Sequence, residues 1–454
     1  MAEAPASGDP GGTVGAVDTA RVMRRVALRV LPFMAGAYFI NSLDKTNLSV
    51  AALTMNDDLG ISKTAFGLAS GLFFIGYFVM EVPSNLIMHR VGARRWMSRI
   101  MISWGLISAL TALAQGAVSL DIFRVLLGLA EAGFYPGVLM YLTYWFPEES
   151  RARMLSLFVT GGSLSGILGP PLSAAIVGQH QILGIAGWRM MFVIEGVPAV
   201  LLGLLALIVL TDRPEKASWL AGPDRQWLLE RIGTQRHRVD AGRELRAFTA
   251  LRNPRVALLS VAYFCKCFGQ YALAFFLPQM ILAFEKSSGQ KYTTFQVGLL
   301  TAVPSVLAVA AAITWGWHSD RTGERVWHAA APLLLGAVGI ALSVELRQPV
   351  LILLALSVAS RGIGSMSNSF FQLPSTFLTG AAAAAGLAMI NAVGNLGGFA
   401  APYFTGWLFD NTGSFTVACW VMGGFMALGA VGILVFSGTG RAGSIAQEPV
   451  PTGA

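Results

Sequence analysis

Residues 30–53 of the chain read VLPFMAGAYFINSLDKTNLSVAAL. The stretch is long enough to cross a bilayer as a helix, which takes about 20 mostly apolar residues. Asp44 and Lys45 stand side by side within it, although a charge at the bilayer centre costs roughly 2.5 to 3.5 kcal/mol on insertion scales. Such charges are tolerated where they face protein or a water-filled cavity. The segment therefore predicts a first membrane-spanning helix that carries a binding site or a pathway.

The composition of the whole chain is that of an integral membrane protein. Of 454 residues, 54% are hydrophobic and 12% are charged, and the charged share is about half that of a soluble domain. We place twelve apolar segments near 30–54, 65–87, 98–118, 122–145, 153–178, 189–210, 256–284, 294–317, 329–346, 349–372, 383–408 and 416–437. The sequence thus predicts an all-α integral membrane fold of twelve transmembrane helices in two six-helix halves.

A long polar interval divides these segments into two sets of six. We expect a disordered cytoplasmic tail over 1–20, an N-terminal six-helix bundle over 21–210, a cytoplasmic linker over 211–254, a C-terminal six-helix bundle over 255–437 and a cytoplasmic tail over 438–454. Two six-helix halves joined by a linker are typical of secondary transporters.

The basic residues give the orientation in the membrane. We count 23 of the 32 Lys and Arg residues on alternate loops, the same side as the linker. By the positive-inside rule both termini are cytoplasmic, and we expect a multi-pass protein of the cell inner membrane. The basic excess is accordingly assigned to contact with membrane lipid, and no nucleic acid partner is expected.

Other functional classes find no support in the residues. Cys265, Cys267 and Cys419 all fall in expected helices, and the five histidines lack ligand spacing, so we expect no disulfide and no metal. No P-loop pattern is present, and we find no paired nucleophile and base. We expect neither an enzyme nor a cofactor, with an ion gradient rather than ATP as the energy source. A membrane sensor would carry a sizeable soluble domain, and the largest polar segment here is the linker.

Two short basic turns occupy matching places in the two halves. HRVGARR (89–95) follows the second helix, and HSDRTGER (318–325) follows the eighth. A glycine permits a tight turn, and arginines can cap helix ends or pair with a carboxylate. We predict that this loop motif latches the cytoplasmic side in one conformation through Arg90, Gly92, Arg94, Arg95, Asp320 and Arg321.

Several segments in register carry a family resemblance. They are LDKTN (43–47), EVPSN (81–85), RVLLGLAEAGFYPG (124–137), YWFP (144–147), TDRP (211–214) and NAVGNLGGFAAP (391–402). The chain resembles the major facilitator superfamily and, within it, the anion:cation symporter family of phthalate-, tartrate- and galactonate-type permeases. The resemblance implies the major facilitator fold and proton-coupled uptake of a small organic carboxylate anion, such as tartrate, a sugar acid or an aromatic carboxylate. We expect the protein to act as a monomer.

The charged residues of the first and fourth helices are the candidate transport machinery. Glu131 follows Arg124 by seven residues, so both lie on one helix face about two turns apart. The resemblance assigns Arg124 to substrate contact and Glu131 to proton coupling, and Asp44 is the second candidate for a protonatable group. Relatives usually have arginine where this chain has Lys45, and lysine binds as a point charge. A structural alternative is that these groups only form ion pairs between helices.

Polar residues of both halves complete the predicted substrate site. We predict substrate binding by Lys45, Arg124, Asn41, Asn47, Tyr77, Ser163, Gln270, Tyr271, Gln372 and Asn391. Tyr77 and Ser163 rest on the galactonate-type pattern alone, and such groups also bridge packed membrane helices. Lys266 and Arg361 either face the cavity or extend to the headgroups. The alternative function is an anion exchanger or an efflux transporter of the same superfamily.

Overall fold

The computed structural model describes residues 18–236, 252–288, 291–378 and 380–444. The first half contains α1 (Thr19–Leu59), α2 (Lys63–Val91), α3 (Ala93–Leu110), η1 (Thr111–Leu113), α4 (Ala117–Glu131), α5 (Phe134–Trp145), α6 (Glu148–Val177) and α7 (Gly187–Val209). A short antiparallel hairpin, β1 (Gln181–Ile182) and β2 (Ile185–Ala186), joins α6 to α7.

The linker and the second half are also helical. The linker holds η2 (Pro214–Lys216) and α8 (Gly222–Arg236). The second half contains α10 (Pro254–Ser288), α11 (Thr294–Thr322), α12 (Val326–Ser343), α13 (Pro349–Phe370), η3 (Pro374–Thr376), α14 (Gly380–Thr412) and α15 (Thr416–Ser444). Residues 237–251 lie outside the described ranges, so the extent of the linker over 211–254 stays a prediction.

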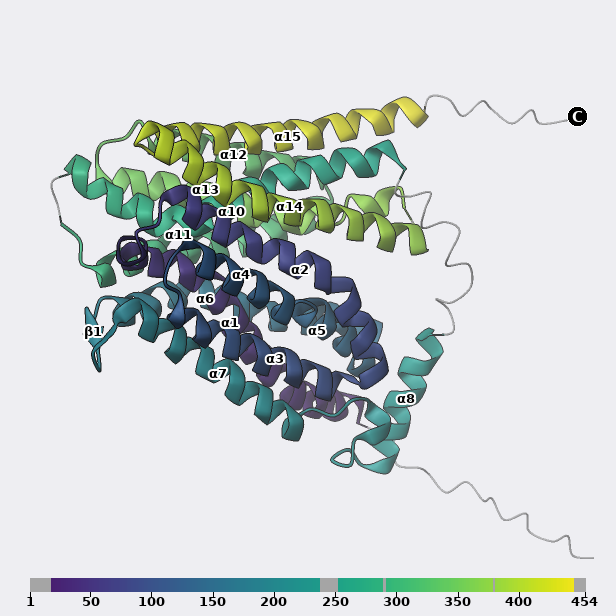
Figure 1. Cartoon of the computed structure of the whole chain (residues 1–454). Coiled ribbons are helices and arrows are strands. Elements are labelled where there is room, and N and C mark those ends of the chain that lie inside the picture. Colours follow the sequence, from purple (N-terminus) through teal and green to yellow (C-terminus); the bar gives the residue numbers. More distant parts are fainter. Residues whose placement is uncertain (1–17, 237–251, 289–290, 379, 445–454) are drawn as a thin grey trace, which may run out of the picture.

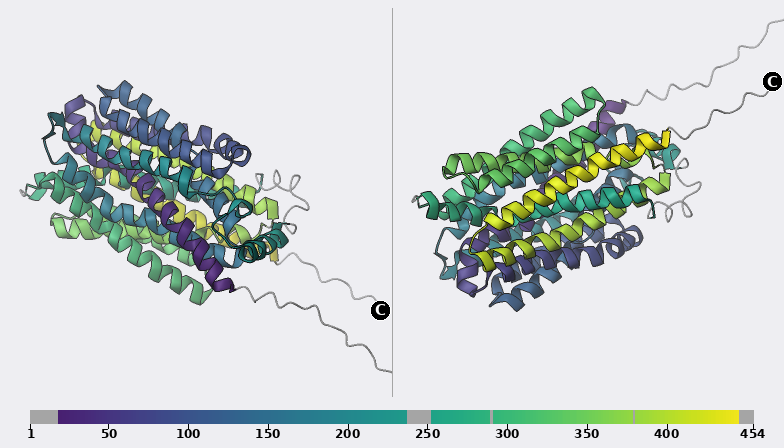
Figure 2. Two further views of the ribbon diagram at one scale, coloured as in Figure 1. Left: turned by 90° about the horizontal axis from the view of Figure 1, so that it is seen from below. Right: turned by 90° about the horizontal axis from the view of Figure 1, so that it is seen from above.

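The two halves lie side by side as bundles of long helices (Figure 1). The views in Figure 2 show the start of α1, helix α8 and the end of α15 at the same end of the molecule, which we call the linker end. We call the opposite end, where α2 and α11 begin, the far end.

The predicted all-α membrane fold is confirmed. Among the described residues, eleven candidate spans are long and apolar enough to cross a membrane. Helix α14 stands in the place of the remaining predicted helix, and its 33 residues extend over about 50 Å at 1.5 Å per residue. The outer boundaries differ from those predicted: α1 already begins at Thr19, where Asp18 accepts a hydrogen bond from the Arg21 N–H and caps the helix, and α15 continues past residue 437 to Ser444.

The predicted fourth helix, 122–145, is broken in two. Helix α4 ends at Glu131 and α5 begins at Phe134. Gly133 lies between them with φ +88°, a left-handed conformation that favours glycine. Pro136 has no N–H to donate to the Ala132 carbonyl, and its ring would clash with that carbonyl in a continuous helix. The break places Glu131 at a helix end inside the bundle.

The two halves touch at the far end. Asp410 near the end of α14 accepts hydrogen bonds from the backbone N–H groups of Lys63 (3.2 Å) and Thr64 (2.7 Å), and from the Thr64 hydroxyl (2.5 Å). Gly67 of α2 lies so close to α14 that a Cβ there would be 2.2 Å from the Pro402 carbonyl oxygen. Backbone contact of this kind between membrane helices requires small residues, and here it closes one end of the interface between the bundles.

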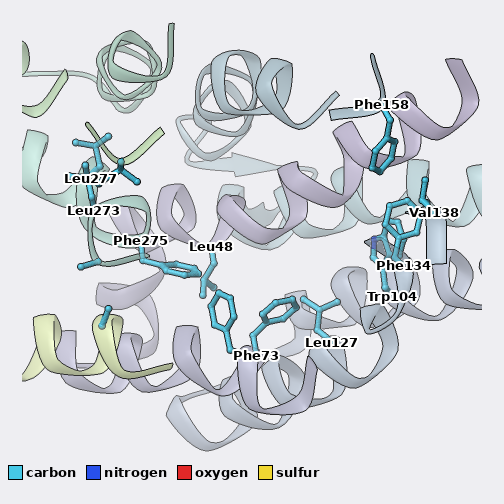
Figure 3. Packing of buried hydrophobic residues seen from close by; sticks show 14 of the residues in the cluster. Leu48, Phe73, Trp104, Leu127, Phe134, Val138, Phe158, Leu273, Phe275 and Leu277 are labelled. Atoms are coloured by element: carbon cyan, nitrogen blue, oxygen red, sulfur yellow. The ribbon is translucent and has the colours of Figure 1, made fainter. Parts of the chain in front are cut away.

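Apolar side chains fill the bundles between these polar contacts (Figure 3). In the first half Trp104, Phe134 and Val138 gather on one side of the view, and Phe73 lies beside Leu127. All five are buried. Their packing fixes the rotation of α2, α4 and α5, and with it the direction of the charged residues on those helices.

The linker packs against the first half at the linker end. Trp219 stacks on Trp145 of α5 with ring centroids 5.5 Å apart, and Arg29 of α1 lies over the Trp219 ring at 5.1 Å. The Tyr141 hydroxyl donates to the Thr211 carbonyl at 2.7 Å. Leu228 of α8 is buried as well, so this linker helix turns an apolar face inward.

Candidate functional site

A buried ion pair between α1 and α4 is the centre of the site. Lys45 Nζ lies 2.8 Å from Glu131 Oε1. Glu131 is fully buried at the last position of α4, whereas the Lys45 side chain keeps 31% of its surface exposed. The Lys45 ammonium also lies 5.2 Å from the centroid of the Tyr77 ring. The Lys45 ammonium thus contacts a carboxylate and an aromatic face, and part of the Lys45 side chain remains accessible.

Arg124 lies on the same helix as Glu131 and is just as deeply buried. Its guanidinium carbon stands 5.0 Å from the centroid of the Phe73 ring, a cation–π distance. In the part of the chain that the structure describes, none of its three guanidinium nitrogens has a hydrogen-bond partner. A buried donor left without a partner is costly, so the arrangement is suited to an incoming acceptor.

Asp44, the neighbour of Lys45 in α1, belongs to a second polar group. Its Oδ1 atom accepts hydrogen bonds from the Ser108 hydroxyl of α3 and from Asn47 Nδ2 at 3.1 Å. Asn47 Nδ2 also donates to Glu195 Oε2 of α7 at 3.0 Å, and Ser173 of α6 donates to Glu195 Oε1 at 2.7 Å. Four helices therefore meet at this network.

Glu195 was not among the predicted site residues. The signal that pointed to Asp44, an acidic residue inside an apolar run, applies equally to Glu195 in the centre of α7. The structure connects it to Asp44 through Asn47.

A cavity of about 540 Å³ lies between the halves. Tyr38 and Ser163 line it from the first half, and Lys266 and Gln270 line it from the second, where the Lys266 ammonium donates to Gln270 Oε1. The remaining polar lining consists of hydroxyls, from Ser305, Ser360 and Ser367. Lys266 therefore faces the cavity, and Arg361 is not among the residues that line it.

Eight of the ten predicted substrate contacts are not among the residues that line this cavity: Lys45, Arg124, Asn41, Asn47, Tyr77, Tyr271, Gln372 and Asn391. Asn41 is fully buried with both amide atoms unpaired among the described residues, and Asn47 is committed to the two carboxyl groups. Gln372 lies beyond the end of α13, because that helix ends at Phe370 ahead of Pro374. Asn391 is half-buried in α14.

The two predicted tyrosines lie between the charged centre and the second half. The Tyr77 ring is beside Lys45 and Phe73. The Tyr271 ring contacts Phe74 with centroids 4.5 Å apart. Both side chains are half-buried, so they form part of the wall where α2 meets α10.

The two basic turns lie at the linker end, but their contacts differ from those predicted. In the first turn, Asp212 Oδ1 accepts from the backbone N–H of Arg94 at 3.0 Å and stands beside Gly92, whose φ is +97°. One N–H group in the first turn of α3 is thus bound by a carboxylate from the linker. The contact uses the backbone of Arg94 rather than the side chains of Arg90, Arg94 or Arg95.

In the second turn the charged pair is between Asp320 and Arg325, at 2.8 Å. Arg321, which we had predicted to act with Asp320, lies over the Trp317 ring at 4.9 Å. Three residues separate the two arginines across the turn, and the left-handed Gly323 directs Arg325 back toward Asp320.

Glu324 in the same turn is held by several donors. It accepts from the Trp327 N–H at 2.7 Å, the His328 N–H at 3.1 Å and His328 Nδ1 at 2.9 Å. His328 Nε2 is in turn 2.7 Å from His318 Nδ1. Partial burial opposes ionisation of Glu324, but the hydrogen bonds outweigh it and hold the pKa of this carboxyl below its ordinary value.

Two helix bundles around a shared cavity, with charged side chains buried at membrane depth, define a membrane transport protein. The family model of the Major Facilitator Superfamily matches residues 34–402. The "Putative tartrate transporter" of Agrobacterium vitis is 45% identical over 420 residues, which cover 92% of this chain and 95% of that protein. The "Quinolone resistance transporter" of Acinetobacter baumannii is 37% identical over 410 residues, covering 90% and 93% of the two chains.

A solved structure shows the same fold. The crystal structure of a bacterial homolog of the human lysosomal transporter Spinster, inward-facing and unoccupied, matches with a TM-score of 0.71 over 95% of this chain and 99% of that chain, at 18% identity. The chain belongs to the Major Facilitator Superfamily. The predicted resemblance is confirmed, and the chain is a multi-pass membrane transporter and not an enzyme.

Proposed function

We propose that this protein is a proton-coupled symporter of the inner membrane that takes up a small organic anion of the tartrate type. The observation that carries the proposal is the Lys45–Glu131 ion pair, 2.8 Å long and partly open to space. Protonation of Glu131 removes its charge and frees Lys45 for the carboxylate of a substrate. Binding of the anion and binding of the proton then favour each other, which is the linkage that symport needs.

The cations of the two halves support a substrate with two anionic ends. Arg124 offers a planar fork that is suited to a carboxylate, and Lys266 faces the cavity from the second half. The serine hydroxyls of the lining can bind hydroxyl groups of the substrate. A hydroxylated dicarboxylate fits this chemistry, in agreement with the name of the Agrobacterium vitis relative.

The contact at the far end supports an assignment of the conformation. If the linker end is cytoplasmic, as the basic loops indicate, both termini are inside and the Asp410 contact closes the outer side. The structure then represents the inward-facing state, in which substrate and proton are released to the cytoplasm. The proton gradient is the proposed energy source and no cofactor is required.

Efflux or exchange is the second candidate, because the Acinetobacter baumannii relative is named a quinolone resistance transporter. The two functions differ in the direction of net flux under an imposed gradient. An importer accumulates anion when the outside is acidic, whereas an exchanger moves label only when unlabelled anion is present on the other side.

Uptake by proteoliposomes tests the proposal. Labelled tartrate and other carboxylates are offered with an inwardly directed proton gradient to the wild type, Lys45→Ala and Glu131→Gln. We expect accumulation by the wild type, its loss in Lys45→Ala, and exchange without accumulation in Glu131→Gln. Arg347→Ala, which removes an exposed cation far from the cavity, is the control. If the folded wild type takes up none of the anions under the proton gradient, the proposal is rejected.

A further inference from the structure

The side chain of Asn47 lies between two carboxyl groups of different helices. Its Nδ2 atom donates to Asp44 Oδ1 at 3.1 Å and to Glu195 Oε2 at 3.0 Å. The two acceptor oxygens therefore share one nitrogen. Asp44, Asn47 and Glu195 are 2%, 1% and 5% exposed, so the bridge is shielded from solvent at membrane depth.

The surroundings of Glu195 supply hydroxyl and amide groups but no cation. Ser173 of α6 donates to Oε1, and α3 contributes Ser108, which binds the partner carboxyl. Apart from Asp44 and Lys45, the charged residues on the helices packed against α7 lie toward helix ends: Arg94, Arg95 and Arg99 in the first turns of α3, Glu148, Glu149, Arg151 and Arg153 at the start of α6, Arg21, Arg24, Arg25 and Arg29 in the first turns of α1, and Asp57 and Asp58 at its end. On α7 itself, Arg189 pairs with Asp58. Among the described residues, Glu195 forms no ion pair.

The balance of charge leaves one carboxyl group without a counterion. Lys45 and Arg124 supply two positive charges, whereas Asp44, Glu131 and Glu195 can supply three negative ones. An unpaired charge in a low-dielectric interior is strongly disfavoured, and two carboxylates that share a site do not both ionise readily. Because Asn47 donates to both groups, neither is distinguished by that contact.

We propose that Asp44 and Glu195 hold one proton between them, and that Glu195 is a proton-coupling residue that acts through Asp44. The inference rests on the proposed symport. When the proton leaves Glu195 and binds Asp44, Glu195 carries the negative charge; when it returns, Asp44 carries it. No electrons move, and the O–H bond broken on one carboxyl group is formed on the other.

The position of this proton sets the charge of the anion site. With Asp44 neutral, Lys45, Arg124 and Glu131 together carry one excess positive charge, which attracts an anion. With Asp44 ionised, the same group is neutral and the anion is released more easily. Glu195 thereby allows the site to change its charge while the proton stays inside the protein.

The test combines infrared spectroscopy with transport. Protonated carboxyl groups absorb infrared light at a different frequency from carboxylates. In purified protein at neutral pH, Glu195→Gln should lose one band of a protonated carboxyl group, and Glu195→Asp should keep it. In proteoliposomes, Glu195→Gln should lose gradient-driven accumulation by roughly tenfold, a typical size for coupling between two sites, while exchange of labelled substrate persists. Glu195→Asp should restore accumulation.

Glu345→Gln is the matched control, because it removes an exposed carboxyl group beyond the end of α12, outside this network, and should change neither measurement. An unchanged band in Glu195→Gln, or accumulation at the wild-type rate, would overturn the proposal. If Glu195→Gln does not fold, Ser173→Ala replaces it, because this change keeps the carboxyl group and removes one of its hydrogen-bond donors. Ser173→Ala should retain the band and lower accumulation. Full accumulation in this variant would count against the proposal. The infrared measurement needs no substrate, so a wild type without proton-driven uptake would reject the proposed function and leave the shared proton to be judged separately.

Discussion

Lys45 and Glu131 form an ion pair 2.8 Å long at the point where the fourth transmembrane segment is interrupted. The pair joins α1 to the last residue of α4. Because Glu131 is fully buried, removal of Lys45 leaves a buried carboxylate, whereas removal of the Glu131 charge leaves a partly exposed ammonium group.

Replacing Lys45 with alanine should destabilise the protein more than replacing Glu131 with glutamine. The first change leaves a buried carboxylate without its counterion, which costs about 3 to 5 kcal/mol when a buried pair is broken. The double variant Lys45→Ala/Glu131→Gln should recover most of the loss. Thermal unfolding in detergent measures the three variants, and a double variant no more stable than Lys45→Ala would contradict this account.

Arg124→Lys should weaken substrate binding although the positive charge is retained. Lysine lacks the planar fork and the flat face that lies over Phe73. We expect the affinity to fall by about tenfold, equal to about 1.4 kcal/mol, in an equilibrium binding assay. Arg99→Lys removes a comparable contact with Trp96 away from the cavity and should bind normally. Equal loss in both variants would indicate a general defect.

The helices and the charged centre could be predicted from the sequence because both depend on local composition. An apolar run of sufficient length predicts a span, and a charge inside it predicts a site. This reasoning points to Asp44 and Lys45, and the family resemblance adds the roles of Arg124 and Glu131. Their partners could not be predicted, since the rotation of each helix depends on packing against residues far away in the sequence.

Two further differences have identifiable physical causes. The break after Glu131 lies inside an apolar run, and hydropathy does not register it, although Gly133 and Pro136 carry the signal. Gln372 was assigned to the cavity from its place near the tenth segment, but the helix ends at Phe370 and Gln372 lies past it. In both cases the conformational limits of glycine and proline were more informative than polarity.

Gly133→Ala should reduce folding yield and thermal stability. Gly133 has φ +88°, and an added Cβ would stand 2.2 Å from Ser84 Oγ. The left-handed conformation alone costs a residue with a side chain about 1 to 2 kcal/mol, and Ser84 must also move from its hydrogen bond with Trp96. Gly36→Ala is the control, because nothing lies within 4 Å of a Cβ there. Equal stability of the two variants would contradict the predicted strain.

Glu324 should make the stability of the second half depend on pH in the acid range. Its pKa is lower in the folded protein than in the unfolded chain, so its contribution is present above the ordinary glutamate pKa of about 4.3 and is lost as the pH falls through the folded value. Thermal unfolding at neutral and acid pH measures the effect. Glu324→Gln should be less stable than wild type at neutral pH, and the difference should shrink in acid. A constant difference would show that ionisation is not responsible.

Asp410→Asn should shift the conformational equilibrium away from the closed far end. The Asp410 carboxylate binds two N–H groups in the first turn of α2, where the helix dipole favours a negative charge. Asparagine has one acceptor oxygen and no charge, so it cannot bind both groups equally well. Spin labels at Leu183→Cys and Arg347→Cys, one on each half at the far end, report the separation of the bundles. We expect a larger population at the longer distance in Asp410→Asn.

Asn411→Ala is the control for this change, because the Asn411 amide donates to the Trp407 carbonyl of its own helix at 2.7 Å and should leave the distance distribution unaltered. Substrate should also bind the two states differently, since a ligand shifts an equilibrium only by its differential affinity. If Asp410→Asn opens the far end, saturating tartrate should alter the two populations in the variant. An unchanged distribution in Asp410→Asn would mean that backbone packing at Gly67 and its neighbours holds the far end closed without this carboxylate.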